Sequence, residues 1–218
     1  MFVEKMSRGG DAGETTILIL DRREDPVTPL LNQWTYQAMI HELLGLQNNR
    51  VDLKHLSHLT DEMKEVVLSS DDDEFFRKIM FSNFGDVADS IHQLVQTFLQ
   101  NKKSQAQFST IEDMQRIIEN FPEFKKGERN TSKHFNILEE LRKLVDTRNL
   151  YDISELEQDL VSGPDSKNKH FKAVQALLEK EDINKLEALR LVLLFALRYE
   201  NDDTVKQLKN LLKSKHEI

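Results

Sequence analysis

The stretch NFGDVADSIHQLVQTFL, residues 83–99, carries the clearest helical pattern in the chain. Its apolar residues recur at helical spacing and form one continuous stripe, made of Val87, Ile91, Leu94, Val95, Phe98 and Leu99. Such a stripe predicts an amphipathic helix that buries one face against another element. The stretch therefore indicates a fold built mainly from packed helices.

A second helix is predicted to begin at Ser109, where Glu112 completes a capping box, and Pro122 interrupts it. The next helix is predicted from about Thr131 to Arg148. Its apolar residues share one face: Phe135, Leu138, Leu141, Leu144 and Val145. This long helical pair, at about 83–148, could offer an apolar groove to a partner helix. Alternatively, its stripes face the pair's own interior, which periodicity alone favours because most apolar stripes are core.

Four further helical patterns follow toward the C-terminus. The first is predicted to start at a capping box of Ser154 and Glu157 and to end at Gly163-Pro164. The others cover residues 169–180, 184–199 and 203–215. With the pair at 83–148 they make a helical array.

The N-terminal part has a different character. Residues 1–14 contain three glycines and no periodicity, which is typical of a flexible leader. Thr16–Leu20 is continuously apolar, like a strand covered on both faces, and an acidic turn follows it. A helix is predicted over 32–44, ended by Gly45, and a short strand over 65–68. The predicted fold is mainly α, preceded by a small α/β portion.

Composition excludes several classes of function. The formal net charge of −8 argues against non-specific nucleic-acid binding, because a phosphate backbone would be repelled. The absence of cysteine excludes disulfides and thiolate metal sites and fits the cytoplasm. Apolar runs such as 191–197 are far shorter than the roughly 20 residues that cross a bilayer, so a membrane role would act through a partner.

Two groups of side chains are candidates for catalysis or metal binding. Asp21, Glu24 and Asp25 follow a strand, where α/β sheets place ligands, so a metal-dependent phosphohydrolase built on Asp21 and Asp25 is one alternative. The other interpretation is that these carboxylates cap a turn and pair with arginines. His55 and His58 have no carboxylate arranged to orient them, and the phosphate-binding and nucleophile motifs are absent from the sequence. We therefore expect no metal, no cofactor and no enzyme activity.

Charge is unevenly distributed. Residues 51–74 hold eight acids against two lysines, a net charge of −6, whereas residues 123–148 hold seven bases against five acids, a net charge of +2. The second segment includes Lys133 and Arg142. Such a basic strip is either a solvated face or a surface that steers an acidic partner.

The run ILILDRREDPVTPLLNQWTYQAMIHELLGLQNNRVDL, residues 17–53, closely resembles SM (Sec/Munc-type, syntaxin-binding) proteins, and NQWTYQAM most resembles their vacuolar protein sorting, endosomal branch. Further blocks similar to that branch occur in the right order: VVLSS at 66–70, DEFF at 73–76, NFGDV at 83–87, IEDMQRIIENFPEFKK at 111–126, TSKH at 131–134, SELEQDL at 154–160 and RLVLLFALRYE at 190–200. The resemblance covers about residues 15–200.

The resemblance implies a fold and a division into domains. After the leader at 1–14, residues 15–70 would form the α/β passage from a truncated central domain, and residues 71–218 a helical SNARE-binding lobe with its long hairpin at about 83–148. The N-terminal domain of the family, which grips syntaxin, would be missing.

The resemblance also implies a function without catalysis: binding SNAREs and templating their assembly for vesicle fusion between Golgi, endosome and vacuole. The hairpin would receive a syntaxin-like SNARE and a vesicle SNARE, with Pro122 as its hinge. Phe135 would contact the vesicle SNARE with Leu138 and Leu141 beside it, and Lys133 and Arg142 would steer acidic partner segments. Such a protein would be cytoplasmic and peripheral on Golgi or endosomal membranes through its partners. The other alternative is an inert helical scaffold.

Overall fold

The computed structural model describes residues 2–6, 15–101, 129–200 and 202–216, which form two compact units. Unit 1 comprises residues 1–32 and 148–218, and unit 2 comprises residues 33–147. The domain boundary expected after residue 70 stays a prediction, because these units describe compactness only. Most described elements are helices, which confirms the mainly α fold predicted from the sequence.

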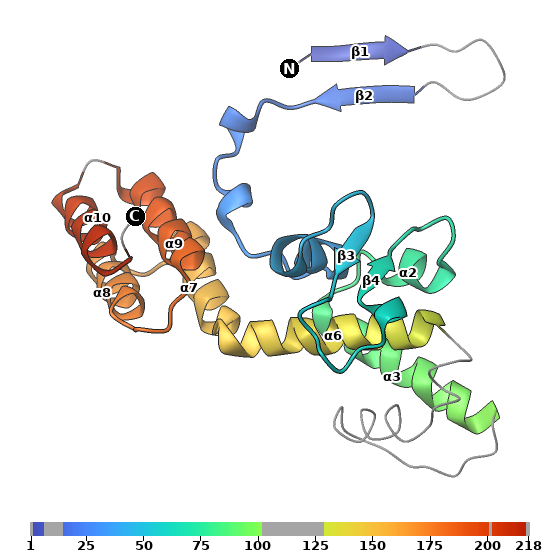
Figure 1. Ribbon diagram of the computed structural model, residues 1–218. Coiled ribbons are helices and arrows are strands. Elements are labelled where there is room, and N and C mark those ends of the chain that lie inside the picture. The colour runs from blue at the N-terminus through green and yellow to red at the C-terminus, as the bar shows by residue number, and fades with distance from the viewer. Residues whose placement is uncertain (1, 7–14, 102–128, 201, 217–218) are drawn as a thin grey trace. The chain divides into compact units, whose positions relative to one another are not determined.

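Unit 1 contains a β-hairpin and a group of four helices (Figure 1). The helices are α7 (Leu150–Ser162), α8 (Lys167–Leu178), α9 (Lys185–Tyr199) and α10 (Asp203–His216). Each contributes an apolar stripe to a shared core, in which Leu191 and Phe195 of α9 are fully buried. Phe195 packs its ring against Tyr199, with centroids 4.7 Å apart. The helices predicted at 169–180, 184–199 and 203–215 are confirmed.

The start of α7 differs from the prediction. The helix begins at Leu150, with Asn149 before it in a left-handed conformation (φ 52°), and Ser154 and Glu157 are buried within the helix. The predicted capping box was therefore wrong. The apolar stripe starts already at Leu150 and Ile153, so the helix extends a full turn farther toward the N-terminus than the motif indicated.

The end of α7 agrees with the prediction and is reinforced by α9. Gly163 is the C-cap residue of α7, as expected. The Arg198 guanidinium of α9 donates hydrogen bonds to the carbonyls of Asp159, Leu160 and Gly163 at 2.8–2.9 Å. These are carbonyls that a helix end leaves without internal partners, so Arg198 ties α9 to the last turn of α7.

The hairpin pairs β1 (Phe2–Met6) with β2 (Thr15–Ile19) in antiparallel register, from Phe2 opposite Ile19 to Met6 opposite Thr15. β1 lies inside the expected leader, and the backbone edge that β2 offers explains why these five residues are extended. The apolar run was predicted to be covered on both faces, which is wrong for this structure. Ile17, Leu18, Ile19 and Leu20 are 42–68% exposed because β2 gains an edge neighbour in β1 and not a layer over its faces.

Two short 3-10 turns, η1 (Arg22–Glu24) and η2 (Thr28–Leu30), complete unit 1. η2 packs against α9, and the chain leaves the unit at Asn32. The segment after the hairpin is thus attached to the helical group.

Unit 2 combines a small sheet with helices. Its elements are α1 (Tyr36–Met39) continuing into the π-helical turn η3 (Ile40–Leu44), β3 (Arg50–Asp52), η4 (Asp61–Met63), β4 (Glu65–Val67), α2 (Glu74–Ile79), α3 (Phe84–Asn101) and α6 (Arg129–Thr147). The predicted strand at 65–68 pairs with β3, which sequence analysis missed, in a register that places Val51 opposite Val66. Both valines are buried. Gly45 ends the predicted helix with φ 83°, a conformation that favours glycine.

α3 and α6 pack against each other (Figure 1). Val87 and Ile91 of the stripe that begins α3 are fully buried, as are Ile137 and Leu141 of α6. Ser109, Glu112 and Pro122, on which the second arm of the predicted hairpin depends, lie outside the described residues.

Gly163 generates a prediction about stability. A Cβ at this position would lie 2.7 Å from the Asp159 carbonyl oxygen and 2.8 Å from the Asp159 Cα. Because backbone atoms must move to relieve this overlap, we expect Gly163→Ala to lower the free energy of unfolding by about 1–3 kcal/mol in urea denaturation. Gly85→Ala is the control, since a Cβ there meets no atom within 4 Å and alanine favours the helix. Equal effects of the two substitutions would contradict the prediction.

Candidate functional site

The predicted partner-binding residues lie on α6, whose apolar side faces the interior of unit 2. Phe135 and Leu138 are 2% exposed and Leu141 is 0% exposed. α6 packs against α3 and η3 along this side. In this structure the three residues therefore form core, as the interior-facing interpretation expects, and they do not line an open apolar groove.

The carboxylate of Asp73, at the start of α2, is the centre of a buried polar cluster. Two members of this cluster lie on α6. The carboxylate accepts hydrogen bonds from Lys133 Nζ at 2.5 Å, from His134 Nε2 at 2.9 Å and from the Phe76 backbone N–H at 2.9 Å. The last bond makes Asp73 the N-cap of α2. Asp73 is 2% exposed, so a charged carboxylate is held inside the protein by these three donors.

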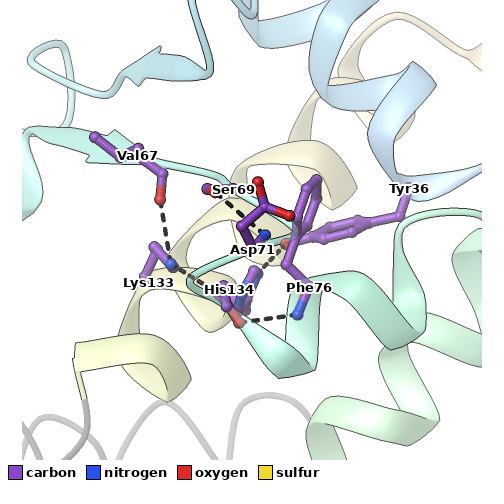
Figure 2. A network of polar contacts seen from close by, with 8 residues as sticks. Tyr36, Val67, Ser69, Asp71, Phe76, Lys133 and His134 are labelled. Carbon is purple, nitrogen blue, oxygen red and sulfur yellow. Dashed lines mark hydrogen bonds and ion pairs between the residues drawn. The ribbon is translucent and has the colours of Figure 1, made fainter. Parts of the chain in front are cut away.

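The cluster extends to the sheet and to α1. Figure 2 shows Lys133 reaching the Val67 carbonyl, with His134, Tyr36 and Phe76 close to one another. Lys133 Nζ donates to the Val67 carbonyl at 3.2 Å, and the Tyr36 hydroxyl lies 2.9 Å from His134 Nδ1. The His134 ring stacks on Phe76 with an interplanar angle of 9°. We call Asp73, Lys133, His134 and Tyr36 the Asp73 cluster; it joins α6 to α1, α2 and β4.

Electrostatics determines the protonation states of this cluster. Burial opposes the charge of Asp73, but the hydrogen bonds from His134, Lys133 and the Phe76 N–H outweigh it and hold the Asp73 pKa well below its usual range. Burial lowers the pKa of His134 despite the nearby carboxylate, so its imidazole is neutral at neutral pH. Nε2 then donates to Asp73, and Nδ1 accepts from the Tyr36 hydroxyl.

The cluster therefore holds α6 to α1, α2 and β4 through buried hydrogen bonds. A lowered carboxyl pKa contributes stability above the pKa of the unfolded state, about 3.9, and this contribution is lost as the pH falls through lower values. In the sequence, Asp73 stands out only as one of the acids of the segment 51–74. Asp73 precedes the helix that contains Phe76, and an aspartate at that position is a signal for a helix N-cap.

The predicted basic residues of α6 have different environments. Lys133 is buried in the Asp73 cluster and cannot at the same time present its charge on the surface. Arg142 is half-buried and lines a groove of about 540 Å³ between α6 and the loop at 55–58. Pro122, the predicted hinge, lies outside the described residues.

This groove borders the part of α6 between Asn136 and Thr147, and most of its lining residues are polar. Its lining is made of His55, Leu56, Ser57, His58, Asn136, Glu139, Glu140, Arg142, Lys143, Asp146 and Thr147. Glu140, which is 7% exposed at its side chain, lies 3.1 Å from His55 Nε2 and 3.7 Å from Lys143 Nζ. The charged lining residues of α6 are three acids, Glu139, Glu140 and Asp146, and two bases, Arg142 and Lys143.

The carboxylates after β2 form a turn, as the alternative to a metal site proposed. Asp21 accepts from the Arg23 N–H at 2.9 Å and pairs with Arg23 Nη2 at 2.6 Å. Asp25 accepts from the backbone N–H groups of Val27 and Thr28. Within the residues that the structure describes, no group of three or more metal-binding side chains is found. A phosphohydrolase built on Asp21 and Asp25 has no support.

Over the described ranges, none of the helices combines the length and the apolar character needed to span a bilayer.

The Asp73 cluster predicts unequal effects for two lysines of α6. Lys133→Met leaves the buried Asp73 carboxylate without its cation, so we expect a loss of about 3 kcal/mol in the free energy of unfolding at pH 7. The matched control is Lys143→Met, because the Lys143 side chain is 63% exposed and its ion pair contributes little. Urea denaturation followed by circular dichroism compares the two. A Lys133→Met variant as stable as Lys143→Met would refute the role assigned to the cluster.

Comparison with known proteins relates this architecture to one family. The Sec1 family model matches residues 4–218. A vacuolar protein sorting-associated protein 45 homolog of Arabidopsis thaliana is 48% identical over 202 residues, which are 91% of this chain and 35% of that protein. The vacuolar protein sorting-associated protein 45 of Homo sapiens is 45% identical over 188 residues, which are 84% of this chain and 32% of that protein. The chain thus spans about a third of the length of these relatives.

Solved structures agree. A structure of the SM protein Vps45 in complex with the Qa SNARE Tlg2 matches with a TM-score of 0.75 and 41% identity, covering 90% of this chain and 36% of that one. The Unc18–syntaxin 1 complex of Monosiga brevicollis, at 16% identity and a TM-score of 0.66, shares the fold over 89% of this chain and 36% of that one. The resemblance inferred from residues 17–53 is confirmed: the chain belongs to the Sec1 family of SM proteins, in its vacuolar protein sorting branch.

Proposed function

We propose that this chain is part of an SM protein that binds SNAREs and templates their assembly during vesicle docking and fusion. The observation that carries the proposal is the likeness, at 41% identity over 90% of the chain, to a Vps45 solved with a Qa SNARE. Aligning two disordered SNARE segments would lower the ordering cost of their assembly, so the mechanism needs no chemical step. A syntaxin-like SNARE is the first partner and a vesicle SNARE the second.

The groove along α6 is the surface we assign to a SNARE segment. Arg142 and Lys143 supply positive charge there, beside the carboxylates of Glu139, Glu140 and Asp146. Three buried residues would contribute indirectly: Phe135, Leu138 and Leu141. Their packing fixes the position of α6 and hence the shape of the groove. This replaces direct contact of Phe135 with the vesicle SNARE by an indirect role in the described conformation.

The site of action follows from the partners. A protein that reaches membranes only by binding SNAREs would reside in the cytoplasm and associate peripherally with Golgi or endosomal membranes. The relatives named for vacuolar protein sorting support this assignment.

Calorimetry with the cytosolic part of a syntaxin-like SNARE tests the proposed function. We expect binding by the wild-type chain, and an affinity at least about tenfold lower for the charge-reversed variant Arg142→Glu/Lys143→Glu, because its groove would repel acidic segments. Lys209→Glu/Lys213→Glu changes the net charge equally at exposed positions of α10 and should bind like the wild type. Unchanged binding by both folded variants would remove the groove from the proposal. Absence of binding by the wild type would favour the inert scaffold.

The hinge role of Pro122 remains a separate prediction, based on the family resemblance. Replacing proline by alanine restores a backbone N–H and removes the steric conflict that interrupts a helix, so Pro122→Ala should favour the extended hairpin. Hydrogen exchange across residues 115–135 is the measurement, with slower exchange expected in the variant. A profile identical to that of the wild type would contradict the hinge.

A further inference from the structure

Positive charge is concentrated on two helices of unit 1, α8 and α10. α8 contains three lysines and no acid, and α10 contains four lysines and one acid. The two helices pack against each other within the helical group (Figure 1). Together they carry a net charge of +6, on a chain whose formal net charge is −8. We call α8 and α10 the basic pair.

α10 has an apolar side and a basic side. Its apolar side is at most 5% exposed and consists of Val205, Leu208 and Leu212. Lys206, Lys209 and Lys213 are exposed and follow one another at intervals of three and four residues. Side chains at this spacing lie on the same side of a helix, so the three ammonium groups form a row along α10. We call these three residues the lysine row.

The charges of the lysine row are weakly compensated inside the protein. Lys206 pairs with Asp203 at 2.8 Å, but both side chains are more than 70% exposed, and such a pair contributes little. Among the described residues, no carboxylate lies within ion-pair distance of Lys209 or Lys213. Most of this positive charge therefore faces solvent and is available to an anionic partner.

The residue types on the basic pair favour a broad anionic surface over a protein segment. None of the large apolar side chains that are exposed in the described part of the chain lies on α8 or α10. The two helices also contain no arginine. Protein interfaces are centred on aromatic and arginine side chains and are depleted in lysine. Lysine is a compact point charge, which suits attraction to many headgroups without a fixed geometry.

We propose that the lysine row, supported by the lysines of α8, is a contact site for a membrane surface that contains anionic phospholipids. Clusters of four to eight basic residues on an amphipathic helix are typical of binding to such headgroups. Because the apolar side of α10 is buried in the helical group, the contact is electrostatic and the helix does not insert. The site goes beyond the proposed SNARE binding and uses none of the groove residues.

The strength of this contact decides its role. Each lysine close to an anionic membrane strengthens binding by about fivefold, so the row of three contributes about a hundredfold. The negative charge of the rest of the chain opposes binding, but at physiological salt its effect is screened beyond about 8 Å. A contact of this size does not replace recruitment by a SNARE. It would orient a protein that a SNARE already holds at the membrane, as the second of two linked contacts.

Co-sedimentation of the chain with lipid vesicles, in the absence of any SNARE, tests the site. We expect binding to vesicles of equal parts phosphatidylcholine and phosphatidylserine, weaker binding as salt is added, and no binding to phosphatidylcholine alone. Lys209→Gln/Lys213→Gln removes two lysines from the row and should weaken binding by about 25-fold. Charge reversal in Lys209→Glu/Lys213→Glu should weaken it further.

The matched control is Lys54→Gln/Lys78→Gln, which changes the net charge equally at side chains of unit 2 that are 62% and 68% exposed. This variant should bind like the wild type, and circular dichroism verifies that each variant is folded. Absence of binding by the wild type, or an equal loss in the control, would overturn the proposal. Binding of soluble polyglutamate but not of the phosphatidylserine vesicles would also overturn it, in favour of an acidic protein partner.

Discussion

The charge of Asp73, held inside unit 2 at 2% exposure, constrains most of that unit. An ionised carboxylate is tolerated there only while several donors surround it, and its donors come from the first turn of α2 and from α6. Lys133 in turn satisfies a carbonyl at the end of β4. Docking of α6 on α2 therefore compensates the buried charge of Asp73, and the Val67 carbonyl adds a bond from the sheet to the same lysine.

This constraint gives α6 two sides with different roles. The side that carries Phe135 and Leu141 is core, and Lys133 is fixed by its ion pair. The opposite side remains polar and borders the groove with Arg142 and Lys143.

Sequence periodicity predicted what depends on local spacing and missed what depends on distant pairing. The helices at the C-terminus and the stop at Gly163 follow from apolar spacing and cap chemistry. Asp73 and Lys133 are 60 residues apart, and Asn32 and Glu157 are 125 apart, so their contacts have no local signature. The capping box at Ser154 failed because α7 begins earlier, at Leu150, and Glu157 lies inside the helix, where it bonds the remote Asn32.

Comparison of the two buried acids shows why the same functional group serves different ends. Asp73 has a lysine, a neutral histidine and a backbone N–H directed at it, and it remains charged far below neutral pH. Glu157 shares one asparagine with Glu187 and lies near a single guanidinium, so its proton is held up to about pH 7. The number and charge of the hydrogen-bond donors, and not burial alone, thus decide whether a buried carboxyl has a lowered or a raised pKa.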